Sequence, residues 1–480
     1  MVNITRRGLL AGAGAIAAIA SAVRPNAGQA SEAPSTILTA GRRTLDVNGR
    51  AASVFGLRRP DGTMGLVTEV DMPFRVSLRN DIGVDTLIHW HGLTPPYRQD
   101  GVPGISGPPI PTGASAQYDF PLAFPGTFWM HSHEGLQEQS LLSAPLIIRP
   151  RGGIGDRQEV VLLLHDFAFR APSEIYAGLR HPKAAGDKSG SGNGMSAMPG
   201  MAKASAPRMA MDLNDVAYDA FLANDRTIAD PDIVRVEPGG RILLRVINAA
   251  ASSNFLIDLG AHSAVLVAVD GHAVQSVAAS AFPVAVAQRI DLEIQLDAGP
   301  FALPVFATLE GEAKRSALIL ATAGGTIPKL AMLAAAKAEP LNLRLEQRLR
   351  ATKPLPRKAA DRTHRVDLTG DMSTYIWSLN GATYGQDMPL MVATGERVEL
   401  LMINKTMMAH PMHLHGHVFQ VVAIDGKRFD GAMRDTVLVP PRSAVTVAFD
   451  ADNPGHWAFH CHNLYHMEAG MMTTVRYEGT

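Results

Sequence analysis

The chain has 480 residues, of which 46% are hydrophobic and 19% are charged, and its formal net charge is −1. At roughly 150 residues per domain, this length indicates about three domains, each large enough to bury a core without disulfides. The near-neutral charge excludes a broad basic surface of the kind that nucleic acids and acidic membranes require, so no nucleic-acid partner is expected. The single cysteine cannot form a disulfide within the chain.

The N-terminus has the layout of an export signal. Arg6 and Arg7 precede an apolar stretch at residues 8–23, and small residues follow up to Ala30. The adjacent arginines resemble a bacterial twin-arginine signal, which exports folded proteins. The apolar stretch is shorter than the ~20 residues of a membrane span, and a retained anchor is the alternative. We therefore expect residues 1–30 to be a signal peptide, a periplasmic mature chain, and no stable membrane insertion.

Three segments of the chain share one pattern, an apolar strand that ends in asparagine. They are "RVSLRN", "RILLRVIN" and "RVELLMIN", which end at Asn80, Asn248 and Asn404. Their alternating or clustered apolar residues are typical of half-buried and fully buried strands. Nine and eleven residues after the asparagine, the first and third copies have histidine, namely His89, His91, His413 and His415. The second copy has Ile257 and Leu259 at these offsets.

A second anchor in each copy is a glycine that precedes an aromatic strand. These glycines are Gly126, Gly299 and Gly455. Beyond the glycine, the first copy reads His-Ser-His, the third reads His-Cys-His, and the second reads Pro-Val-Phe. The histidines of this second set are His131, His133, His460 and His462. Histidine contributes only 17 of 480 residues, so its return at equivalent places indicates one β-rich module present three times.

The repeats divide the chain into three domains, which we expect at residues 36–152, 156–328 and 362–480. The second domain would carry a methionine-rich insertion at about 189–211. Residues 334–361, rich in alanine, proline and basic residues, would form a solvated connector between domains. Regular turn signals and little helical periodicity indicate an all-β chain of three tandem Greek-key β-sandwiches.

The spacing of the histidines predicts a metal cluster between the first and third domains. Side chains alternate across a strand, so His89 and His91 share one face while Trp90 points the other way. The same holds for the other three pairs, and eight imidazoles converge if the equivalent faces of the two domains pack together. Neutral imidazole binds copper, zinc, iron and nickel. Eight ligands are too many for one metal, and they fit about three ions with open positions for a small ligand.

Cys461 lies between two of these histidines and must face the opposite way. His466 follows Cys461 by five residues, Met471 follows His466 by five, and His410 precedes the third-domain pair. Two histidines, one cysteine and a weak axial methionine form the trigonal ligand set of a blue-copper electron-transfer site. The first copy cannot build this site, because its equivalent residues are Thr86, Ser132, Gln137 and Leu142. The alternative for Cys461 is a buried small hydrophobe.

The four motifs "HWHG" (89–92), "HSH" (131–133), "HPMHLHGH" (410–417) and "HCHNLYHMEAGM" (460–471) resemble those of the multicopper oxidases. The resemblance covers essentially the whole mature chain, and it implies three cupredoxin-like domains and four copper ions. It implies a type 1 copper held by His410, Cys461, His466 and Met471. It implies a type 2 copper held by His89 and His413. It implies two type 3 coppers, one held by His91, His131 and His462, and the other by His133, His415 and His460.

The same resemblance implies that substrate loses electrons singly at the type 1 copper and that dioxygen becomes water at the other three. Electrons entering at Cys461 would reach these through His460 and His462, its neighbours on either side. Asp100, nine residues after His91, matches an acid that several family members use near the cluster, and we expect it to relay protons. The alternative is a turn residue before Gly101. Some relatives have a carboxylate directly after the second type 1 histidine, where this chain has a methionine, so a second proton donor stays unassigned.

The methionine-rich segment bears on the reductant. Its methionines are Met195, Met198, Met201, Met209 and Met211. Thioether is a soft ligand that favours Cu(I), and the surrounding Gly, Ser, Ala and Pro cannot form a core. We therefore expect these methionines to recruit cuprous ion, as in bacterial cuprous oxidases that serve copper tolerance. A low-complexity insertion without this role is the alternative.

Three other functions stay open at this point. One is a laccase-like oxidation of phenols or aromatic amines by the same copper sites. Another, from a different class, is a copper-binding or storage protein without turnover. A copper nitrite reductase is disfavoured, because a mononuclear partner site needs a histidine on only one side of Cys461.

Overall fold

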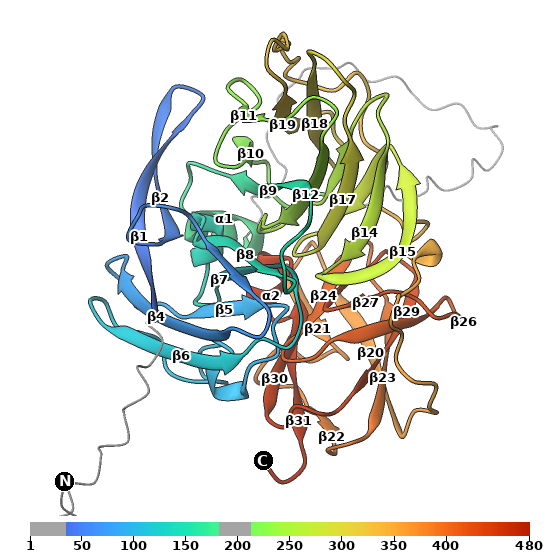
Figure 1. Cartoon of the computed structure of the whole chain (residues 1–480). Helices are drawn as coiled ribbons and strands as arrows, with labels where there is room; N and C mark the ends of the chain where they lie inside the picture. Colours follow the sequence, from blue (N-terminus) through green and yellow to red (C-terminus); the bar gives the residue numbers. More distant parts are fainter. Residues whose placement is uncertain (1–34, 182–212) are drawn as a thin grey trace, which may run out of the picture. The chain divides into compact units, whose positions relative to one another are not determined.

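Strands make up most of the ordered elements in the computed structural model, which describes residues 35–181 and 213–480. Thr36–Thr480 form one unit. Six sheets pair face to face into three sandwiches, which follow one another along the chain (Figure 1). The all-β, three-sandwich fold predicted from the repeats is therefore confirmed. The predicted signal peptide at 1–30 and the methionine-rich stretch at 189–211 lie outside the described residues.

The first sandwich has two sheets of four strands each. One has the order β2-β1-β4-β6, formed by β1 (Thr36–Val47), β2 (Arg50–Arg58), β4 (Pro73–Asp81) and β6 (Ser115–Pro121). The other has the order β3-β8-β7-β5, formed by β3 (Leu66–Glu69), β5 (Ile88–His91), β7 (Gly126–Ser132) and β8 (Ser143–Arg149). Trp90 on β5 is buried between the sheets, where its ring lies against Phe74 and Tyr118. His89 and His91, on either side, consequently face out of this sandwich.

The second sandwich is larger. Its six-stranded sheet, β10-β9-β12-β17-β14-β15, contains β9 (Arg157–Phe167), β10 (Ala220–Ala223), β12 (Arg241–Asn248), β14 (Ala264–Val269), β15 (His272–Ala279) and β17 (Arg289–Gln295). Its five-stranded sheet, β11-β19-β18-β13-β16, contains β11 (Asp232–Arg235), β13 (Phe255–Asp258), β16 (Ala281–Val284), β18 (Ala302–Leu309) and β19 (Arg315–Ala321). Ile257, Leu259 and Val305, which replace histidine or cysteine in this repeat, are buried in its apolar core.

The third sandwich carries the C-terminal motifs. Its first sheet, β21-β20-β23-β29-β25-β26 with β27 paired to β25, contains β20 (Arg362–Asp371), β21 (Ile376–Leu379), β23 (Arg397–Asn404), β25 (Phe419–Ile424), β26 (Lys427–Arg428), β27 (Met433–Arg434) and β29 (Ala444–Asp450). Its second sheet, β22-β31-β30-β24-β28, contains β22 (Leu390–Val392), β24 (His410–Leu414), β28 (Thr436–Val439), β30 (His456–Cys461) and β31 (Met472–Tyr477).

The three sandwiches share one topology. In each, the strand that ends at the repeat asparagine (β4, β12 or β23) pairs in parallel with the strand that begins the repeat (β1, β9 or β20). The asparagine side chain makes the same pair of hydrogen bonds in all three sandwiches. Asn404 Nδ2 donates to the carbonyls of Met408 and Val439 at 2.7 and 2.9 Å, and Asn80 and Asn248 make equivalent bonds. The asparagine thus fixes the loop that leads into the next strand, which carries histidines in the first and third repeats.

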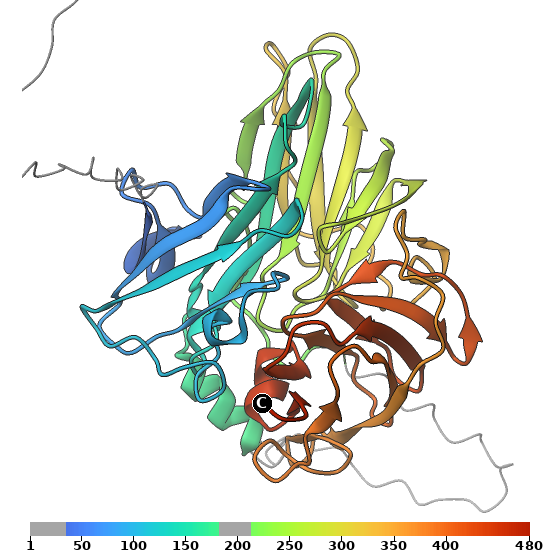
Figure 2. The same cartoon turned by 60° about the horizontal axis from the view of Figure 1, so that its bottom comes forward.

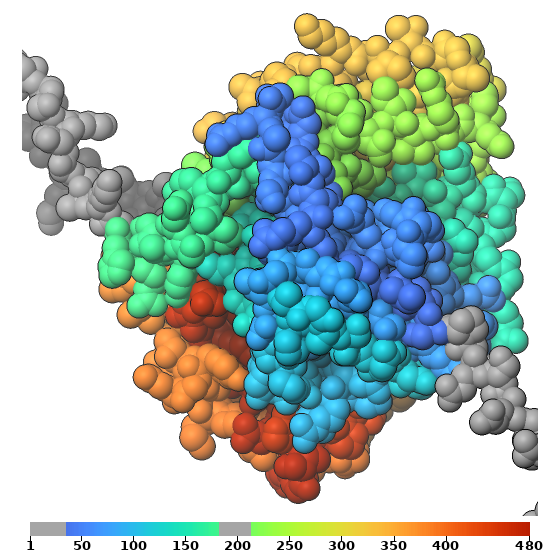
Figure 3. All heavy atoms as spheres, turned by 90° about the vertical axis from the view of Figure 1, so that its left-hand side faces the viewer, coloured from blue at the N-terminus to red at the C-terminus, as the bar shows by residue number. Residues whose placement is uncertain are grey.

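Each sandwich packs against the other two. Figure 3 shows the first sandwich (blue to cyan) lying against the second (green to yellow) and the third (orange to red). Apolar seams fill the contacts: Trp129 with Val286 between first and second, and Val102 with Met472 between first and third. Leu341 lies with Ala285 and Leu438 in the seam between second and third.

The segment at 334–361 differs from the solvated connector expected from its composition. Most of its residues are exposed, but Leu341 and Leu349 are buried, and Glu346 is ion-paired with Arg434 at 2.8 Å. Packing of its leucine side chains between the second and third sandwiches removes their apolar surface from water. This segment therefore joins the second and third sandwiches by packing as well as by chain connection.

Helices are few and short in the described residues. They are α1 (Pro172–Arg180), α2 (Leu464–Glu468), and the 3₁₀ turns η1 (Tyr97–Gln99), η2 (Gln137–Ser140) and η3 (Glu346–Arg348). No helix in the described ranges has the length and apolar content to cross a membrane. Figure 2 shows α1 (teal) beside α2 (red), and Tyr176 on α1 donates to the carbonyl of Glu468 at 3.2 Å. Asn463 caps α2 by accepting from the main-chain N–H groups of Tyr465 and His466, which fixes His466.

Candidate metal centres

The eight paired histidines meet where the first and third sandwiches touch. In the first sandwich, His89 lies directly opposite His131 on the antiparallel strands β5 and β7. In the third, His413 lies opposite His460 on β24 and β30. Both strand pairs turn their histidine faces to the same interface, and all eight rings are buried. The structure thus brings together, in one place, the eight histidines that the sequence predicted to converge.

Within this cluster, the ring nitrogens fall into compact groups. Two groups of three draw on both sandwiches, with ligand atoms within 4.8 Å of one another: His91, His131 and His462, and His133, His415 and His460. A third group contains His89, His91 and His413. The facing Nε2 atoms are 3.4 Å apart for His131 and His462, 3.0 Å for His415 and His460, and 3.4 Å for His89 and His413.

The partners of the outward ring nitrogens show where the lone pairs point. Nδ1 of His89 lies 2.8 Å from the main-chain carbonyl of Asp100, and Nδ1 of His413 lies 2.8 Å from that of Asp435. A carbonyl only accepts, so both Nδ1 atoms carry the proton. The two Nε2 atoms therefore turn lone pairs toward each other. His415 and His460 repeat this arrangement, because the Asp100 carboxylate and the Cys461 carbonyl accept from their Nδ1 atoms at 2.8 and 3.0 Å.

His91 is oriented the other way round. Its Nε2 lies 3.0 Å from Asp435 Oδ1 and 3.1 Å from Thr436 Oγ1, whereas its Nδ1 is buried without a hydrogen-bond partner. The Nδ1 lone pair therefore points into the cluster. Converging, unpartnered imidazole lone pairs repel one another, and a bound cation turns this repulsion into attraction. The donor set fits metal ions of the kind that imidazole prefers.

Burial keeps these rings neutral and ready to coordinate. Desolvation, with repulsion from neighbouring histidines, lowers the pKa well below its ordinary value in His91, His131, His133, His410, His413, His415 and His462. Desolvation likewise lowers the pKa of His460 to about 4. Neutral imidazole is the form that binds metal, so the site does not have to release protons from these rings near neutral pH.

Three buried carboxylates hold the rings in place. Asp100, predicted from the sequence, bonds His415 through Oδ2 at 2.8 Å, and its Oδ1 lies 3.3 Å from His89 Nδ1. Glu138 Oε2 lies 2.7 Å from His131 Nδ1, and burial raises the pKa of Glu138 well above its ordinary value. Asp435 bonds His91 and, through its main chain, His413. Glu138 and Asp435 were not predicted.

Cys461 occupies the opposite face of β30. Its Sγ lies 3.6 Å from His410 Nδ1 and 3.7 Å from His466 Nδ1, and these two nitrogens are 3.1 Å apart. Met471 is buried beside them, with its carbonyl accepting from Cys461 N at 3.0 Å and its N–H donating to the His466 carbonyl at 3.0 Å. Burial raises the pKa of the Cys461 thiol, so metal binding here must displace its proton. The four residues predicted for this site lie together.

The outer faces of these two imidazoles are also held. His410 Nε2 lies 2.8 Å from Thr406 Oγ1, and the Trp377 ring packs 4.2 Å from that of His466. His466 Nε2 lies 2.9 Å from Asp215 Oδ2, which also accepts from Tyr375 Oη at 2.5 Å. Burial opposes ionisation of Asp215, yet its pKa is lowered, because His466 and the hydroxyl of Tyr375 stabilise the carboxylate.

The sequence analysis missed Asp215. It belongs to the second sandwich and follows the methionine-rich stretch closely, so its contact with His466 spans sandwiches and leaves no local pattern. The one sequence signal for it is the run "MDLND", in which carboxylates follow a methionine, because a carboxylate close to a soft thioether suits a cation.

The first sandwich contains a counterpart of the Cys461 site without its thiol and imidazoles. Thr86, Ser132 and Gln137, at the equivalent positions, hydrogen-bond to one another, with Thr86 Oγ1 and Ser132 Oγ donating to Gln137 Oε1 at 2.7 and 2.8 Å. The two sites share a main-chain bond: Ser132 N donates to the Leu142 carbonyl at 2.9 Å, as Cys461 N does to that of Met471. They differ in their side chains and in the turn between these residues, which is the 3₁₀ turn η2 in the first sandwich and the helix α2 in the third.

Three histidines with no predicted ligand role, His417, His165 and His456, have protein partners outside the metal centres. His417 Nε2 lies 2.7 Å from Tyr477 Oη, and His165 Nε2 lies 2.7 Å from Ser143 Oγ. His456 Nε2 lies 3.4 Å from the Thr480 carbonyl at the chain's end. The five methionines proposed to recruit Cu(I) lie outside the described residues.

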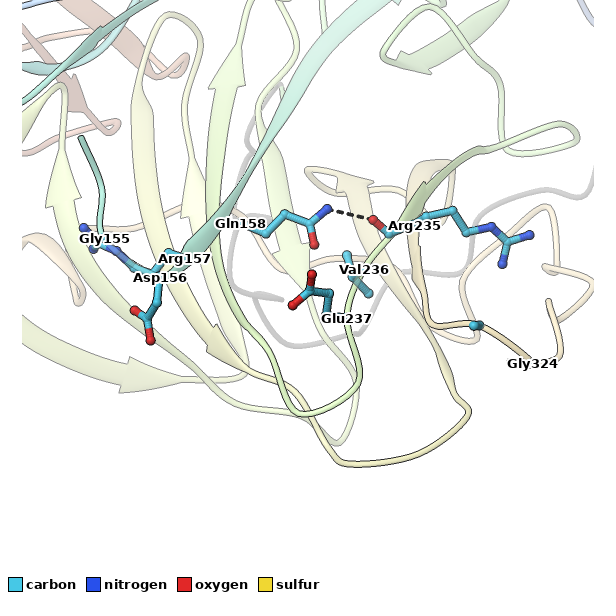
Figure 4. Close-up of a pocket in the computed structure, with 9 residues that line it drawn as sticks. Gly155, Asp156, Arg157, Gln158, Arg235, Val236, Glu237 and Gly324 are labelled. Atoms are coloured by element: carbon cyan, nitrogen blue, oxygen red, sulfur yellow. Dashed lines mark hydrogen bonds between the residues drawn. The ribbon is translucent and has the colours of Figure 1, made fainter. Parts of the chain in front are cut away.

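Away from the histidines, a surface cavity of about 820 Å³ opens in the second sandwich (Figure 4). Arg157, Gln158, Arg235 and Glu237 line it, and Gln158 Nε2 donates to the Arg235 carbonyl at 2.7 Å. Its lining includes no histidine, cysteine or methionine, so it offers no ligand for the metals that the histidine clusters suit.

Comparisons with known proteins agree with this geometry. Multicopper oxidase family models match residues 65–153, 193–322 and 357–479. Multicopper oxidase MmcO of Mycobacterium tuberculosis is 33% identical over 477 residues, which cover 97% of this chain and 91% of that protein. A Copper resistance protein A homolog of Pseudomonas syringae pv. tomato is 27% identical and covers 95% of this chain and 94% of its own length. The fold of Fet3p, a multicopper oxidase that functions in iron import, superposes with a TM-score of 0.75 at 19% identity, covering 92% of this chain and 90% of that one.

Three cupredoxin-like sandwiches with a histidine cluster between the first and third and a cysteine–histidine site beside it define a copper-dependent oxidoreductase. The chain belongs to the multicopper oxidase family, as the extent and identity of the match to MmcO show. The family resemblance of the four histidine motifs is thereby confirmed, and so are an enzymatic oxidoreductase role and copper as the cofactor.

Proposed function

We propose that the chain oxidises cuprous ion one electron at a time and uses the electrons to reduce dioxygen to water. Four copper ions would serve this reaction, one of type 1, one of type 2 and two of type 3. The cysteine site would hold a copper ion suited to one-electron chemistry, and the eight histidines would hold copper ions that supply the four-electron reduction of dioxygen. The type 1 ligands would be His410, Cys461, His466 and Met471. The type 2 ligands would be His89 and His413, and the type 3 ligands would be His91, His131 and His462 on one ion and His133, His415 and His460 on the other.

The grouping of ring nitrogens supports this assignment. The two type 3 sets coincide with two of the compact groups, and the type 1 histidines and cysteine with a further one. His89 and His413 face each other through Nε2. Cys461 is covalently joined to His460 and His462, which belong to different type 3 sets. An electron that enters at the thiolate therefore has a short covalent path to either ion.

Reduction of dioxygen to water also consumes four protons, and two carboxyl groups stand at the cluster. Asp100 would relay protons: its Oδ2 contacts His415, while its buried Oδ1 has no hydrogen-bond donor and can hold a proton. Glu138, whose raised pKa favours the protonated form, stands at His131. No sequence pattern had indicated an acid at this position. Glu138 would hold a proton at Oε1.

Asp215 is the observation that favours cuprous ion as the substrate. Its carboxyl group, whose pKa is lowered, lies 2.9 Å from His466 Nε2 and would favour a cation at the edge of the type 1 site. It follows directly after the methionine-rich stretch, so soft thioethers and a carboxylate are contributed by one segment. Copper resistance protein A of Escherichia coli, 26% identical over 84% of this chain and 86% of its own length, has a name that fits such a role.

A small cavity lies beside the type 1 loop in the described residues. Met408, Ala409 and Asn463 line it, and its volume of about 10 Å³ is room for about one water molecule. Laccase-like oxidation of phenols is the second candidate function, and a copper store without turnover is the third.

The test compares wild-type protein, a deletion of 189–211, and Asp215→Asn, all copper-loaded, in steady-state oxidation of Cu(I), a phenol and a diamine. Cuprous specificity predicts that both changes lower kcat/KM for Cu(I) by at least tenfold and leave the aromatic substrates within about threefold. Equal losses for all three substrates would remove the cuprous assignment. Dioxygen uptake by the wild-type protein separates an oxidase from a store, which would consume none.

The place of action follows from the N-terminal sequence. We infer export through the twin-arginine route, after copper-site assembly in a folded chain, and a periplasmic location. Fractionation of cells that express wild-type protein or Arg6→Lys with Arg7→Lys would locate the protein. Retention of the double variant in the cytoplasm is the expected result, and unchanged periplasmic accumulation would contradict it.

A further inference from the structure

A buried ion pair links the copper-free second sandwich to the histidine cluster. Arg289, at the start of β17, donates through Nη1 to Asp435 Oδ1 at 2.7 Å and through Nη2 to Asp435 Oδ2. Asp435 lies in the third sandwich, between β27 and β28. Both side chains are fully buried, at 0% and 1% exposure, so the pair is bidentate and excluded from solvent.

Asp435 is in turn the residue that holds two of the ligands. Its Oδ1 lies 3.0 Å from Nε2 of His91, a ligand from the first sandwich. Its main-chain carbonyl lies 2.8 Å from Nδ1 of His413, a ligand from the third sandwich. Thr436 Oγ1 donates to Asp435 Oδ1 at 2.9 Å and fixes the carboxylate further. One residue thus sets the ring orientation of two ligands that come from different sandwiches.

The second sandwich holds Arg289 rigidly. Arg289 Nη1 also donates to the Ala287 carbonyl at 2.9 Å, and Nε donates to the Thr127 carbonyl of the first sandwich at 3.2 Å. Its main-chain N–H donates to Asp270 Oδ1 at 2.9 Å, and the other oxygen of Asp270 accepts from Arg434 at 3.1 Å. Apart from its bonds to Asp435, the guanidinium is therefore held by the second and first sandwiches, and the main chain of Arg289 is tied through Asp270 to Arg434 of the third.

Gly92 provides independent evidence that the backbone next to His91 accommodates the Arg289–Asp435 ion pair. It follows His91 and has φ +89°, and a Cβ atom there would lie 2.6 Å from Arg289 Nη2 and 2.7 Å from Asp435 Oδ2. Only glycine accepts both this backbone conformation and this approach. The chain beside the ligand is thus shaped around the ion pair.

We propose that Arg289 is a positioning residue: through Asp435, the second sandwich fixes the rings of His91 and His413 and so maintains the type 2 and type 3 copper sites. The proposal rests on the ligand assignment of the proposed function. His91 turns Nδ1 inward because Asp435 accepts from its Nε2. Without the guanidinium, the Asp435 carboxylate loses two charge-assisted bonds and is free to rotate, and the ring of His91 rotates with it. Outer partners of this kind change metal affinity by about 10–100-fold.

A purely structural ion pair between sandwiches is the competing explanation, and Arg245 provides the matched control. Arg245 is also buried in the second sandwich, with Nη1 bonded to Asp291 Oδ2 at 2.9 Å and to Thr127 Oγ1 of the first sandwich at 2.8 Å. Asp291 contacts no copper ligand among its hydrogen-bond partners. Loss of the Arg245 guanidinium should therefore weaken the contact between the first and second sandwiches without affecting the copper sites.

The experiment compares copper-loaded wild-type, Arg289→Gln and Arg245→Gln after dialysis against a weak chelator. Copper per chain, the type 2 electron paramagnetic resonance signal, the blue type 1 band and the melting temperature are measured. We expect Arg289→Gln to lose at least nine-tenths of the type 2 signal and to keep the blue band, and Arg245→Gln to keep both. An intact type 2 signal in Arg289→Gln, or equal loss in both variants, would overturn the proposal.

Where Arg289→Gln does not fold, Asp435→Asn decides. Oδ1 accepts from both His91 Nε2 and Arg289 Nη1, and Oδ2 accepts from Arg289 Nη2, so whichever way the amide turns, its nitrogen faces a donor of the guanidinium and the side chain no longer holds Arg289 and His91 together. Loss of type 2 and type 3 copper with a normal blue band supports the proposal, and full copper occupancy overturns it. A wild-type protein without type 2 copper would instead refute the ligand assignment, so the two failures are distinguishable.

Discussion

Replacement of Asp100 by asparagine tests the proton relay without changing the shape of the site. The Asp100 side chain is 1% exposed, and its Oδ2 accepts from His415 Nδ1 at 2.8 Å. In the variant, the amide oxygen can keep this bond. The amide nitrogen then replaces Oδ1, which lies 3.3 Å from His89 Nδ1, and two donors face each other. The carboxyl that could hold a proton is gone.

The size of the effect separates two roles for Asp100. Loss of one charge-assisted hydrogen bond costs about 1.5–3 kcal/mol, or about 10–100-fold in rate if it acts on the transition state alone. Loss of proton transfer costs about 100–10,000-fold. We therefore expect kcat to fall by at least about 100-fold, with copper content and the blue band unchanged.

The assay is stopped-flow reoxidation of the fully reduced, copper-loaded protein by dioxygen, followed by the return of the blue band. Asp100→Glu, which keeps a carboxyl, should recover at least a tenth of the wild-type rate. Reoxidation of Asp100→Asn within about threefold of wild type, at full copper content, would show that Asp100 relays no proton. A fall that Asp100→Glu does not relieve would assign it to ligand positioning.

Further predictions concern the thiol, the electron-entry side and pH. Cys461→Ser should abolish the blue band and turnover but keep the copper of the histidine cluster, as absorption and metal analysis would show. Asp215→Asn should shift the type 1 reduction potential upward, because an anion next to His466 is removed; redox titration of the blue band measures this. Burial lowers the pKa of His460 to about 4, from about 6.5 in an unfolded chain, so below pH 6.5 the unfolded state binds more protons. The metal-free protein should therefore be most stable above pH 6.5 and lose up to about 3 kcal/mol per such histidine by pH 4, a loss that urea unfolding at several pH values would detect.

The fold and the convergence of the paired histidines could be predicted from the sequence because both follow from short-range periodicities. Alternation along a strand puts histidines at i and i+2 on one face, and the structure keeps His89 and His91 on one side of β5 with Trp90 on the other. The repeat asparagines marked equivalent strands because each closes the same turn. These patterns depend on the backbone, which the repeats share, so one copy predicts another.

The supporting carboxylates could not be read in this way. Asp435 and His91 are 344 residues apart, and the contact exists only because two sandwiches pack. Asp215 reaches His466 from the second sandwich, and this contact too depends on the relative placement of sandwiches, which no local spacing encodes. Glu138 is near His131 in sequence, but it lies on the 3₁₀ turn η2, outside the strands whose alternation carried the prediction. The connector at 334–361 was misjudged as solvated for the same reason: its composition is that of a linker, and the surface that covers Leu341 belongs to other parts of the chain.

The hydrogen bonds among Thr86, Ser132 and Gln137 show that polar side chains can fill the place in the first sandwich that is equivalent to the Cys461 site. Two hydroxyls and a carboxamide satisfy one another there, at positions that elsewhere present a thiol and two imidazoles. The proposed electron entry therefore depends on side chains that one copy of the sandwich carries and another copy lacks. A second electron-entry site could be built in the first sandwich by Thr86→His, Ser132→Cys, Gln137→His and Leu142→Met. Ser132 already lies between His131 and His133, as Cys461 lies between His460 and His462.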